Sequence, residues 1–218
     1  MKKNESVSLP VIKRLPRYRR YLEELKNAGV VRISSKELSL KMGLTSSQIR
    51  QDLNCFGGFG QQGYGYNIEQ LYNEIGDILG LNKHTKAILI GAGNLGRAIA
   101  THLRFEDRGF DLIGIFDSNP DLFGQKLGNN IIMSTDLLEE FCEKNKPVTA
   151  ILCIPSDVAS STAQKLIDYG IKGFWNFTQC DIAQKHKGVA VENVHLSDSL
   201  MTLCYQINNT ESSGVVKK

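Results

Sequence analysis

The chain has 218 residues, which is enough for one large domain or two small ones, each with its own apolar core. No apolar run approaches the length of a bilayer span, and the first residues lack the apolar stretch of a signal peptide, so we expect a cytoplasmic protein without a membrane partner. The five cysteines show no paired C-x-x-C spacing, which favours reduced thiols over a disulfide framework or a metal site.

Charge is distributed unevenly along the chain, although the net charge is only +3. Residues 1–60 hold 12 Lys and Arg against 5 Asp and Glu, whereas residues 83–218 hold 14 against 15. A basic front half suggests a polyanionic partner, of which nucleic acid is the commonest. A solvated basic face without a partner explains the charge alone equally well.

Helix signals occur throughout the basic half. Pro16 can open a helix that Gly29 closes in the left-handed conformation. A capping box at residues 34–37 begins a second helix that Gly43 ends, and a similar box at residues 45–48 begins a third. Two short helices joined by a tight turn have the layout of a helix-turn-helix motif.

In such a motif the N-terminal residues of the second helix reach base edges in the major groove. Arg and Gln suit this role because they can make paired hydrogen bonds with purines, and small hydroxyl side chains tolerate close approach. The candidate base-contacting residues are Ser46, Ser47, Gln48, Arg50 and Gln51. Short capped helix pairs also occur in proteins that do not bind DNA, so the layout alone leaves the partner open.

A glycine-rich segment with interleaved aromatic residues follows, at residues 55–66. After a recognition helix it looks like the hairpin wing of a winged-helix domain; a floppy loop is the alternative, which the aromatic anchors disfavour. Asn67 can cap a helix that Gly80 ends, and residues 81–85 are the expected linker. Residues 1–82 are therefore predicted to form a winged-helix DNA-binding domain.

The back half opens with a dinucleotide-binding fingerprint. A predicted strand at residues 87–90 runs into a turn with three glycines, and a helix begins near Asn94. Asp117 ends the next strand, 21 residues after the last glycine, and would accept hydrogen bonds from the adenosine ribose. Its carboxylate would repel a 2′-phosphate, which favours NAD(H) over NADP(H). A later strand, at 149–154, ends at the same expected sheet edge. The candidate cofactor-binding residues are Gly91, Ala92, Gly93, Asn94, Leu95, Gly96, Asp117, Ile154, Pro155 and Ser156.

Further predicted elements complete a Rossmann-like α/β domain over residues 83–195: a helix at 159–169 and strands at 173–177 and 189–191. The residues beyond it are too few for a substrate domain, and no catalytic arrangement is recognisable. We therefore interpret the dinucleotide as a sensed ligand and expect neither a small-molecule substrate nor enzymatic activity. Two alternatives stay open: an NAD-dependent oxidoreductase with an N-terminal extension, and a DNA-binding protein whose Rossmann unit is only a dimerisation scaffold.

Apolar residues recur at helical spacing near the C-terminus, over residues 194–208. This amphipathic helix could cover its own sheet or exchange into a partner subunit, and we assign residues 196–208 to dimerisation. Residues 209–218 are expected to form a disordered tail.

The two halves together resemble the Rex family of redox-sensing transcriptional repressors over residues 10–207. The resemblance rests on the segments 14–22, 32–35, 48–53, 56–60, 63–66, 91–96 and 170–177. It implies a homodimer that binds palindromic double-stranded operator DNA through winged-helix domains, with a C-terminal helix swapped between subunits. It also implies that NAD⁺ and NADH compete for one site and that NADH releases the protein from DNA. Further DNA contacts that it implies are Arg14, Phe59, Gly60 and Gln61.

The sequence departs from the family pattern at several positions. Gln51 stands where Lys is common, and Gln61 and Gln62 replace a basic pair, so we expect fewer phosphate contacts and a shallower salt dependence. His102 and His195 stand where many members have Tyr and Asp, which are implied in contacts between subunits. Because both changes are to His, one hypothesis is a partly pH-dependent switch.

Overall fold

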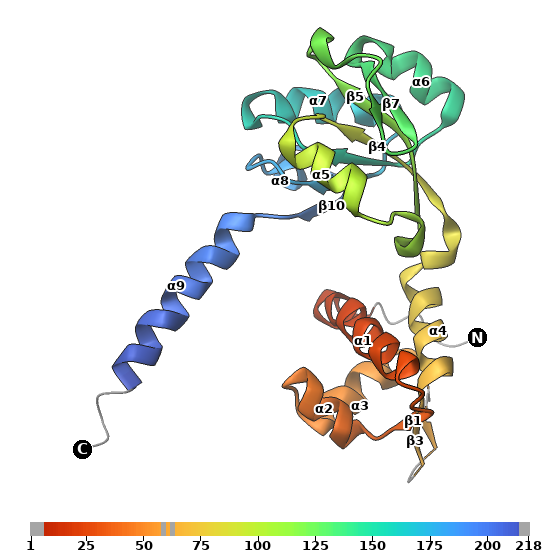
Figure 1. Cartoon of the computed structure of the whole chain (residues 1–218), viewed down its shortest axis with the longest axis vertical. Helices are drawn as coiled ribbons and strands as arrows, with labels where there is room; N and C mark the ends of the chain where they lie inside the picture. The colour runs from red at the N-terminus through yellow and green to blue at the C-terminus, as the bar shows by residue number, and fades with distance from the viewer. Residues whose placement is uncertain (1–6, 58–59, 62–63, 214–218) are drawn as a thin grey trace. The chain divides into compact units, whose positions relative to one another are not determined.

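The structure, a computed structural model, describes residues 7–57, 60–61 and 64–213, with side chains described over 7–57 and 64–209. It divides into two compact units, Met1–Lys83 and His84–Lys218 (Figure 1). Each unit has its own hydrophobic core. A short 3-10 helix, Leu81–Lys83, ends the first unit within the expected linker.

The first unit has a winged-helix fold, as predicted. Its three short strands form one antiparallel sheet in the order β1-β3-β2, and the β2–β3 hairpin follows the third helix. The elements are α1 (Leu9–Asn27), β1 (Arg32–Ile33), α2 (Ser35–Met42), α3 (Ser46–Asn54), β2 (Gly60–Gln61), β3 (Gly65–Asn67) and α4 (Ile68–Leu79).

Side-chain caps mark the starts of α2, α3 and α4. Ser34 Oγ accepts the N–H of Glu37 at 3.1 Å, and the Glu37 carboxylate accepts the N–H of Ser34 at 2.8 Å, so the predicted capping box of α2 is confirmed. Asn67 Oδ1 accepts the N–H of Gln70 at 2.9 Å at the start of α4. Gly80 ends α4 in the left-handed conformation, with φ 73°.

The predicted start of the first helix is wrong. α1 begins at Leu9 with Pro10 in its first turn, so Pro16 lies inside the helix. Proline in a helix interior removes one backbone hydrogen bond. The buried face of α1 offsets that cost, since Leu15 and Tyr18 on either side of Pro16 are both fully buried in the core of the unit.

The second unit is a doubly wound α/β domain. Its sheet has the order β10-β9-β8-β4-β5-β7-β6, in which only β6 is antiparallel to its neighbour. The strand order reverses between β4 and β8, so the predicted Rossmann-like fold is confirmed. The elements are β4 (Thr85–Ile90), α5 (Asn94–His102), β5 (Phe110–Asp117), β6 (Lys126–Leu127), β7 (Asn130–Ser134), α6 (Leu138–Asn145), β8 (Thr149–Leu152), α7 (Ser156–Asp168), β9 (Gly173–Asn176), α8 (Ile182–Lys185), β10 (Ala190–Asn193) and α9 (Leu196–Ser213).

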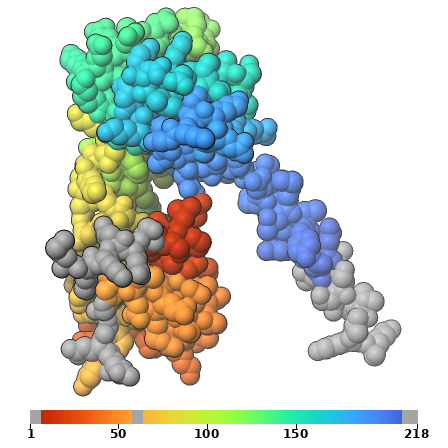
Figure 2. All heavy atoms as spheres, turned by 180° about the vertical axis from the view of Figure 1, so that it is seen from behind, coloured from red at the N-terminus to blue at the C-terminus, as the bar shows by residue number. Residues whose placement is uncertain are grey.

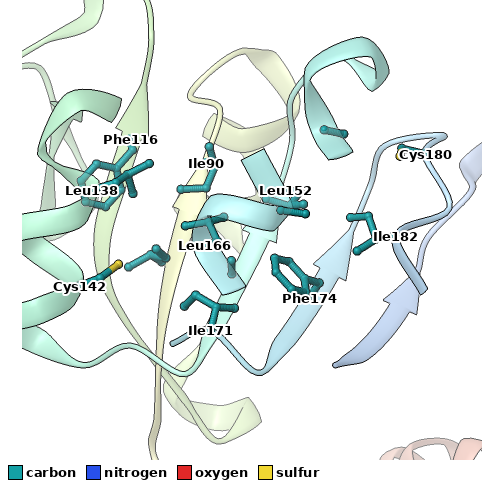
Figure 3. Packing of buried hydrophobic residues seen from close by; sticks show 14 residues of the cluster. Ile90, Phe116, Leu138, Cys142, Leu152, Leu166, Ile171, Phe174, Cys180 and Ile182 are labelled. Atoms are coloured by element: carbon teal, nitrogen blue, oxygen red, sulfur yellow. The ribbon is translucent and has the colours of Figure 1, made fainter. Parts of the chain in front are cut away.

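Parallel strands in this position are buried on both faces, which is why the buried residues of β4 and β8, at 87–90 and 150–152, are all apolar. One face of the sheet is covered in part by α7, whose Leu166 packs into the cluster drawn in Figure 3. Ile90, Phe116, Leu152 and Phe174 bring β4, β5, β8 and β9 into that cluster. This packing fixes the positions of the carboxyl ends of these strands.

The structure contains elements between residues 118 and 148 that the sequence analysis did not predict. The hairpin β6–β7 forms the edge of the sheet beside β5, and α6 follows it. The apolar run in β7 is only Ile131–Met133, which is too short to distinguish a strand from an irregular segment by its periodicity.

The terminal helix α9 is longer than predicted, because it continues past Asn208 to Ser213. The first residues of the expected tail are therefore helical, and residues 214–218 lie outside the described part of the chain. The apolar side chains of α9 are exposed. Figure 2 draws the described atoms of this helix as a blue column. Six of its apolar residues each have an exposed fraction between 49% and 70%: Leu196, Leu200, Met201, Leu203, Tyr205 and Ile207.

Asn67→Ala should lower the free energy of unfolding of the first unit by about 1 kcal/mol, because the first turn of α4 loses its side-chain acceptor. Urea denaturation measures this loss. Asn73→Ala makes the same chemical change at an exposed position within α4 and should change stability by less than about 0.5 kcal/mol. Equal effects of the two changes would show that the cap contributes nothing.

Candidate functional site

The glycines of the fingerprint turn differ in what surrounds them. Gly91 has φ +98°, and a Cβ there would overlap the carbonyl of Cys153. A Cβ on Gly96 would overlap the carbonyl oxygen of Gly91, so this glycine lets α5 pack directly on the end of β4. Gly93 has φ −71°, and apart from its immediate neighbours in the chain no described residue comes within 4 Å of a Cβ built on it. Open space therefore lies over Gly93, at the N-terminus of α5.

Asp117 joins the end of β5 to the turn that follows β4. Its Oδ2 accepts the N–H of Ala92 at 2.6 Å, and its Oδ1 accepts the N–H of Asn119 at 2.8 Å. The residue predicted to meet a ribose thus also holds the fingerprint turn in place. An ionised carboxylate has about four acceptor positions, so two remain for ligand hydroxyl groups.

Arg97 supports the same turn from α5, a role that the sequence analysis missed. Its Nε donates to the carbonyl oxygen of Ala92 at 3.0 Å, and its Nη2 donates to Gln125 Oε1 at 2.8 Å. Ala92 is thus held by Asp117 through its N–H and by Arg97 through its carbonyl. No local pattern predicts the contact between Arg97 and Gln125, because Gln125 belongs to a distant loop.

The remaining candidate cofactor residues lie at the end of β8, the neighbour of β4 on the other side. A Cβ on Gly91 would come within 2.9 Å of the Ile154 side chain, so the two segments adjoin. Pro155 precedes α7, and Ser156 Oγ accepts the N–H of Gln179 at 3.1 Å. The structure therefore brings the two groups of predicted cofactor residues to one edge of the sheet, at its switch point.

The candidate base-contacting residues of α3 divide into two groups. Ser47, Arg50 and Gln51 are exposed and share one face of the helix, as their spacing of three and four requires. Arg50 Nη1 donates to Ser35 Oγ at 3.3 Å, which is a bond between exposed groups. Ser46 is half-buried, with its hydroxyl 3.2 Å from that of Ser39. The exposed face can therefore meet a partner at the cost of one bond between exposed groups, that from Arg50 to Ser35.

The other group surrounds Asp52, a carboxylate with no exposed surface. Arg14 donates to it twice, from Nε at 2.6 Å and from Nη2 at 2.7 Å. Tyr18 Oη donates at 3.0 Å, and Gln48 Nε2 donates at 2.8 Å. Arg14, predicted to contact DNA, therefore bonds within the domain. Its side chain is 29% exposed.

The contact between Gln48 and Asp52 also corrects the predicted capping box of α3. Thr45 Oγ1 accepts the N–H of Gln48 at 3.1 Å, but the Gln48 side chain does not return to the backbone of Thr45 as a full box requires. It bonds to Asp52 because a hydrogen bond to an ionised carboxylate is stronger than one between neutral groups.

Burial by itself would raise the pKa of Asp52, but the hydrogen bonds from Arg14, Gln48 and Tyr18 outweigh it and lower the pKa below its usual value. Asp52 is therefore ionised at neutral pH. Burial and the hydrogen bond to Asp52 raise the pKa of Tyr18, which keeps its hydroxyl protonated as a donor.

The wing is described mainly by its backbone. Gly60 pairs with Tyr66, and Gln61 pairs with Gly65. A Cβ on Gly65 would lie 2.6 Å from the carbonyl oxygen of Ile33, which explains the glycine there. The predicted contact at Phe59 lies outside the described residues.

The described residues include no group of three or more His, Cys, Asp or Glu that could hold a metal ion. Over the same part of the chain, no helix is long and apolar enough to cross a membrane.

Family models match both units. A model described as “Putative DNA-binding protein N-terminus” matches residues 6–54, and one described as “CoA binding domain” matches residues 82–180. The redox-sensing transcriptional repressor Rex of Thermoanaerobacter pseudethanolicus is 57% identical over 97% of this chain and 94% of its own length. Its namesake from Clostridium perfringens (strain SM101 / Type A) is 51% identical over 97% of this chain and 99% of its own.

Two solved structures are also similar to this chain over nearly its whole length. The crystal structure of RSP in complex with β-NADH superimposes with a TM-score of 0.89 at 53% identity, covering 97% of this chain and 99% of that one. RSP in complex with β-NAD⁺ and operator DNA superimposes with a TM-score of 0.88 at 55% identity, with the same coverage.

A winged-helix unit followed by a Rossmann-like unit defines the class of DNA-binding proteins that carry a dinucleotide-binding fold. At this identity over nearly its whole length, the chain belongs to the Rex family of redox-sensing transcriptional repressors.

Asp52→Asn should lower the free energy of unfolding by about 3 kcal/mol at pH 7, because the Arg14 charge loses its partner. The folded-state pKa of Asp52 is lowered, so its stabilising effect is present above the unfolded pKa and is lost as the pH falls through the folded value. Urea unfolding should therefore show the difference between wild type and variant shrinking below about pH 4. A difference that stays constant down to pH 3 would contradict this account.

Proposed function

We propose that the protein is a transcriptional repressor that binds operator DNA and is released from it when NADH binds, so that it responds to the NADH/NAD⁺ ratio. One observation carries the proposal: a fingerprint turn and a helix-turn-helix lie in one chain. This chain matches, over nearly its full length, relatives whose structures were solved with NADH and with NAD⁺ and operator DNA.

For the dinucleotide, the proposed site is the sheet edge formed by residues 91–96, Asp117 and residues 154–156. The open space over Gly93 admits a pyrophosphate to the N-terminus of α5, where unpaired N–H groups favour an anion. Asp117 disfavours an adenosine ribose that carries a phosphate, which argues against NADPH and equally against coenzyme A with its 3′-phosphate. The apolar side chains of Ile154 and Pro155 favour the neutral reduced nicotinamide over the cationic oxidised one.

The proposed DNA-reading surface is the exposed face of α3, with Arg50 as its strongest hydrogen-bond donor. Arg50 and Gln51 suit paired hydrogen bonds to purines, and Ser47 admits close approach. The wing, with Phe59, Gly60 and Gln61, is the proposed second contact. Arg14 is left out of this surface because the buried carboxylate of Asp52 already holds it.

We also propose a homodimer assembled through α9. Four of the exposed apolar residues of this helix, Leu196, Leu200, Leu203 and Ile207, form a stripe at helical spacing, and a second copy of the chain would cover it. A dimer also matches the twofold symmetry of a palindromic operator.

Sensing, rather than catalysis, is the proposed use of the dinucleotide, and the cytoplasm is the proposed location. The relatives are named as repressors. The thiols next to the sheet are poor redox centres, because burial raises the pKa of Cys153 to about 12 and also raises that of Cys142. On this proposal, the redox signal is assigned to the dinucleotide and not to these two thiols.

Gly93→Ala should leave the melting temperature unchanged and weaken NADH binding roughly 10-fold or more, because the new methyl group occupies the space proposed for the pyrophosphate. Gly96→Ala should instead cost about 1–3 kcal/mol of stability through overlap with the Gly91 carbonyl. Energy transfer to NADH from the single tryptophan, Trp175, offers a binding readout. Unchanged NADH affinity in Gly93→Ala would remove the dinucleotide from this edge.

Arg50→Ala should weaken binding to a selected operator duplex by about 1–3 kcal/mol and relax its base preference, with a smaller effect on random duplex. Lys41→Ala, at an exposed position of α2, is the control and should weaken both duplexes alike, if at all. Equal losses on both duplexes for Arg50→Ala would mean that it contacts phosphates only.

Leu200→Glu should convert the dimer to monomers, because it places a charge in the apolar stripe of α9. Sedimentation velocity measures the change. Thr202→Glu adds the same charge to the opposite side of the helix and should leave the dimer intact. Dissociation of both variants, or of neither, would argue against α9 as the interface.

Titration of the operator complex with NADH at a fixed NAD⁺ concentration tests the function as a whole. NADH should release the DNA, and more NAD⁺ should raise the NADH concentration required. If NADH binds but the operator complex persists, the scaffold alternative is favoured. Measurable hydride transfer from NADH to a small carbonyl compound would favour the oxidoreductase.

A further inference from the structure

The most heavily bonded carboxylate in the first unit lies behind the proposed DNA-reading helix. Asp52 Oδ1 accepts from Arg14 Nη2 and Gln48 Nε2, and Oδ2 accepts from Arg14 Nε and Tyr18 Oη. All four acceptor positions of the carboxylate are therefore occupied. Three of these bonds come from two side chains of α1, and the fourth comes from the first turn of α3, so this group joins the two helices.

The ionised state of Asp52 decides which way the Gln48 amide points. A carboxylate without a proton only accepts hydrogen bonds, so the atom of Gln48 that faces it must be the amide nitrogen. Rotation of the amide by half a turn would place two oxygens together and lose a charge-assisted bond. The carbonyl oxygen of Gln48 and its second amide N–H are then left for another partner.

We propose that Asp52 is a positioning residue for base reading. It holds the Gln48 amide in one orientation, so that Gln48 presents one acceptor and one donor, the pattern that adenine N6 and N7 complement in the major groove. Gln48 occupies the first turn of α3, the part of a recognition helix that reaches base edges. The inference rests on the proposed operator binding.

The probe for the test is a duplex that the wild-type protein selects from a randomised pool. Affinity is measured for this duplex, for its single base-pair variants and for a random duplex. If Gln48 reads adenine, replacing one A·T pair should cost the wild type roughly 10-fold in affinity. Gln48→Met should lose that discrimination at the same position only.

The Asp52 contribution is tested by a double change, Asp52→Asn with Arg14→Met. Changing both partners leaves no unpaired charge in the interior and keeps the net charge constant, so folding and affinity for random duplex should be retained. The amide of Gln48 is then free to turn. The roughly 10-fold preference at the Gln48 position should fall toward unity.

A double-mutant cycle separates positioning from general support of the fold. If Asp52 acts through Gln48, adding the double change to Gln48→Met should cause no further loss of discrimination. If the double change causes the same loss with and without Gln48→Met, Asp52 acts on the domain as a whole and the proposal is overturned. It is also overturned if Gln48→Met keeps full discrimination at every position, a result that needs only the single variant to fold.

Tyr18→Phe is the matched control, because it removes one donor to Asp52 and leaves the bond from Gln48 intact. It should lower the unfolding free energy but keep the base preference, whereas a loss of preference would count against the special role of Gln48. Failure of the proposed function gives a different result: the wild type itself would show no preference for any selected duplex.

Discussion

The second unit depends on the close packing of α5 against the end of β4. Gly96 touches the carbonyl of Gly91, so the N-terminus of α5 lies directly at the edge of the sheet. Any larger side chain would push the helix away. The turn between these elements is then held from two sides, by Asp117 and by Arg97, which both bond to the backbone of Ala92. Preorganised N–H groups at a fixed place are what an anionic ligand requires.

In the first unit, the buried carboxylate of Asp52 imposes a comparable constraint. The apolar core of the unit encloses this carboxylate, whose burial would be costly without partners. Three side chains satisfy it, and two of them, Arg14 and Tyr18, belong to a different helix. The position of α3 relative to α1 is thereby fixed by hydrogen bonds as well as by packing. A recognition helix needs such rigidity because base contacts are sensitive to small displacements.

Local signals explain what the sequence could predict. The three fingerprint glycines, the Ser34 capping box and the Asn67 cap each depend on residues a few positions apart, and their geometry follows from spacing. What the sequence could not predict involves distant partners. It did not show that Arg14 bonds to Asp52, 38 residues away. The contact of Arg97 with Gln125 spans 28 residues and leaves no trace in periodicity.

The two functions proposed for this chain become one mechanism only if the ligands affect each other. Thermodynamic linkage requires that operator weakens NADH binding by the same factor by which NADH weakens operator binding. The most direct test is the affinity of the full-length protein for NADH, measured with and without saturating operator duplex. The account predicts that operator raises the dissociation constant for NADH, by the factor found in the reverse titration. Equal NADH affinity in both conditions would contradict it.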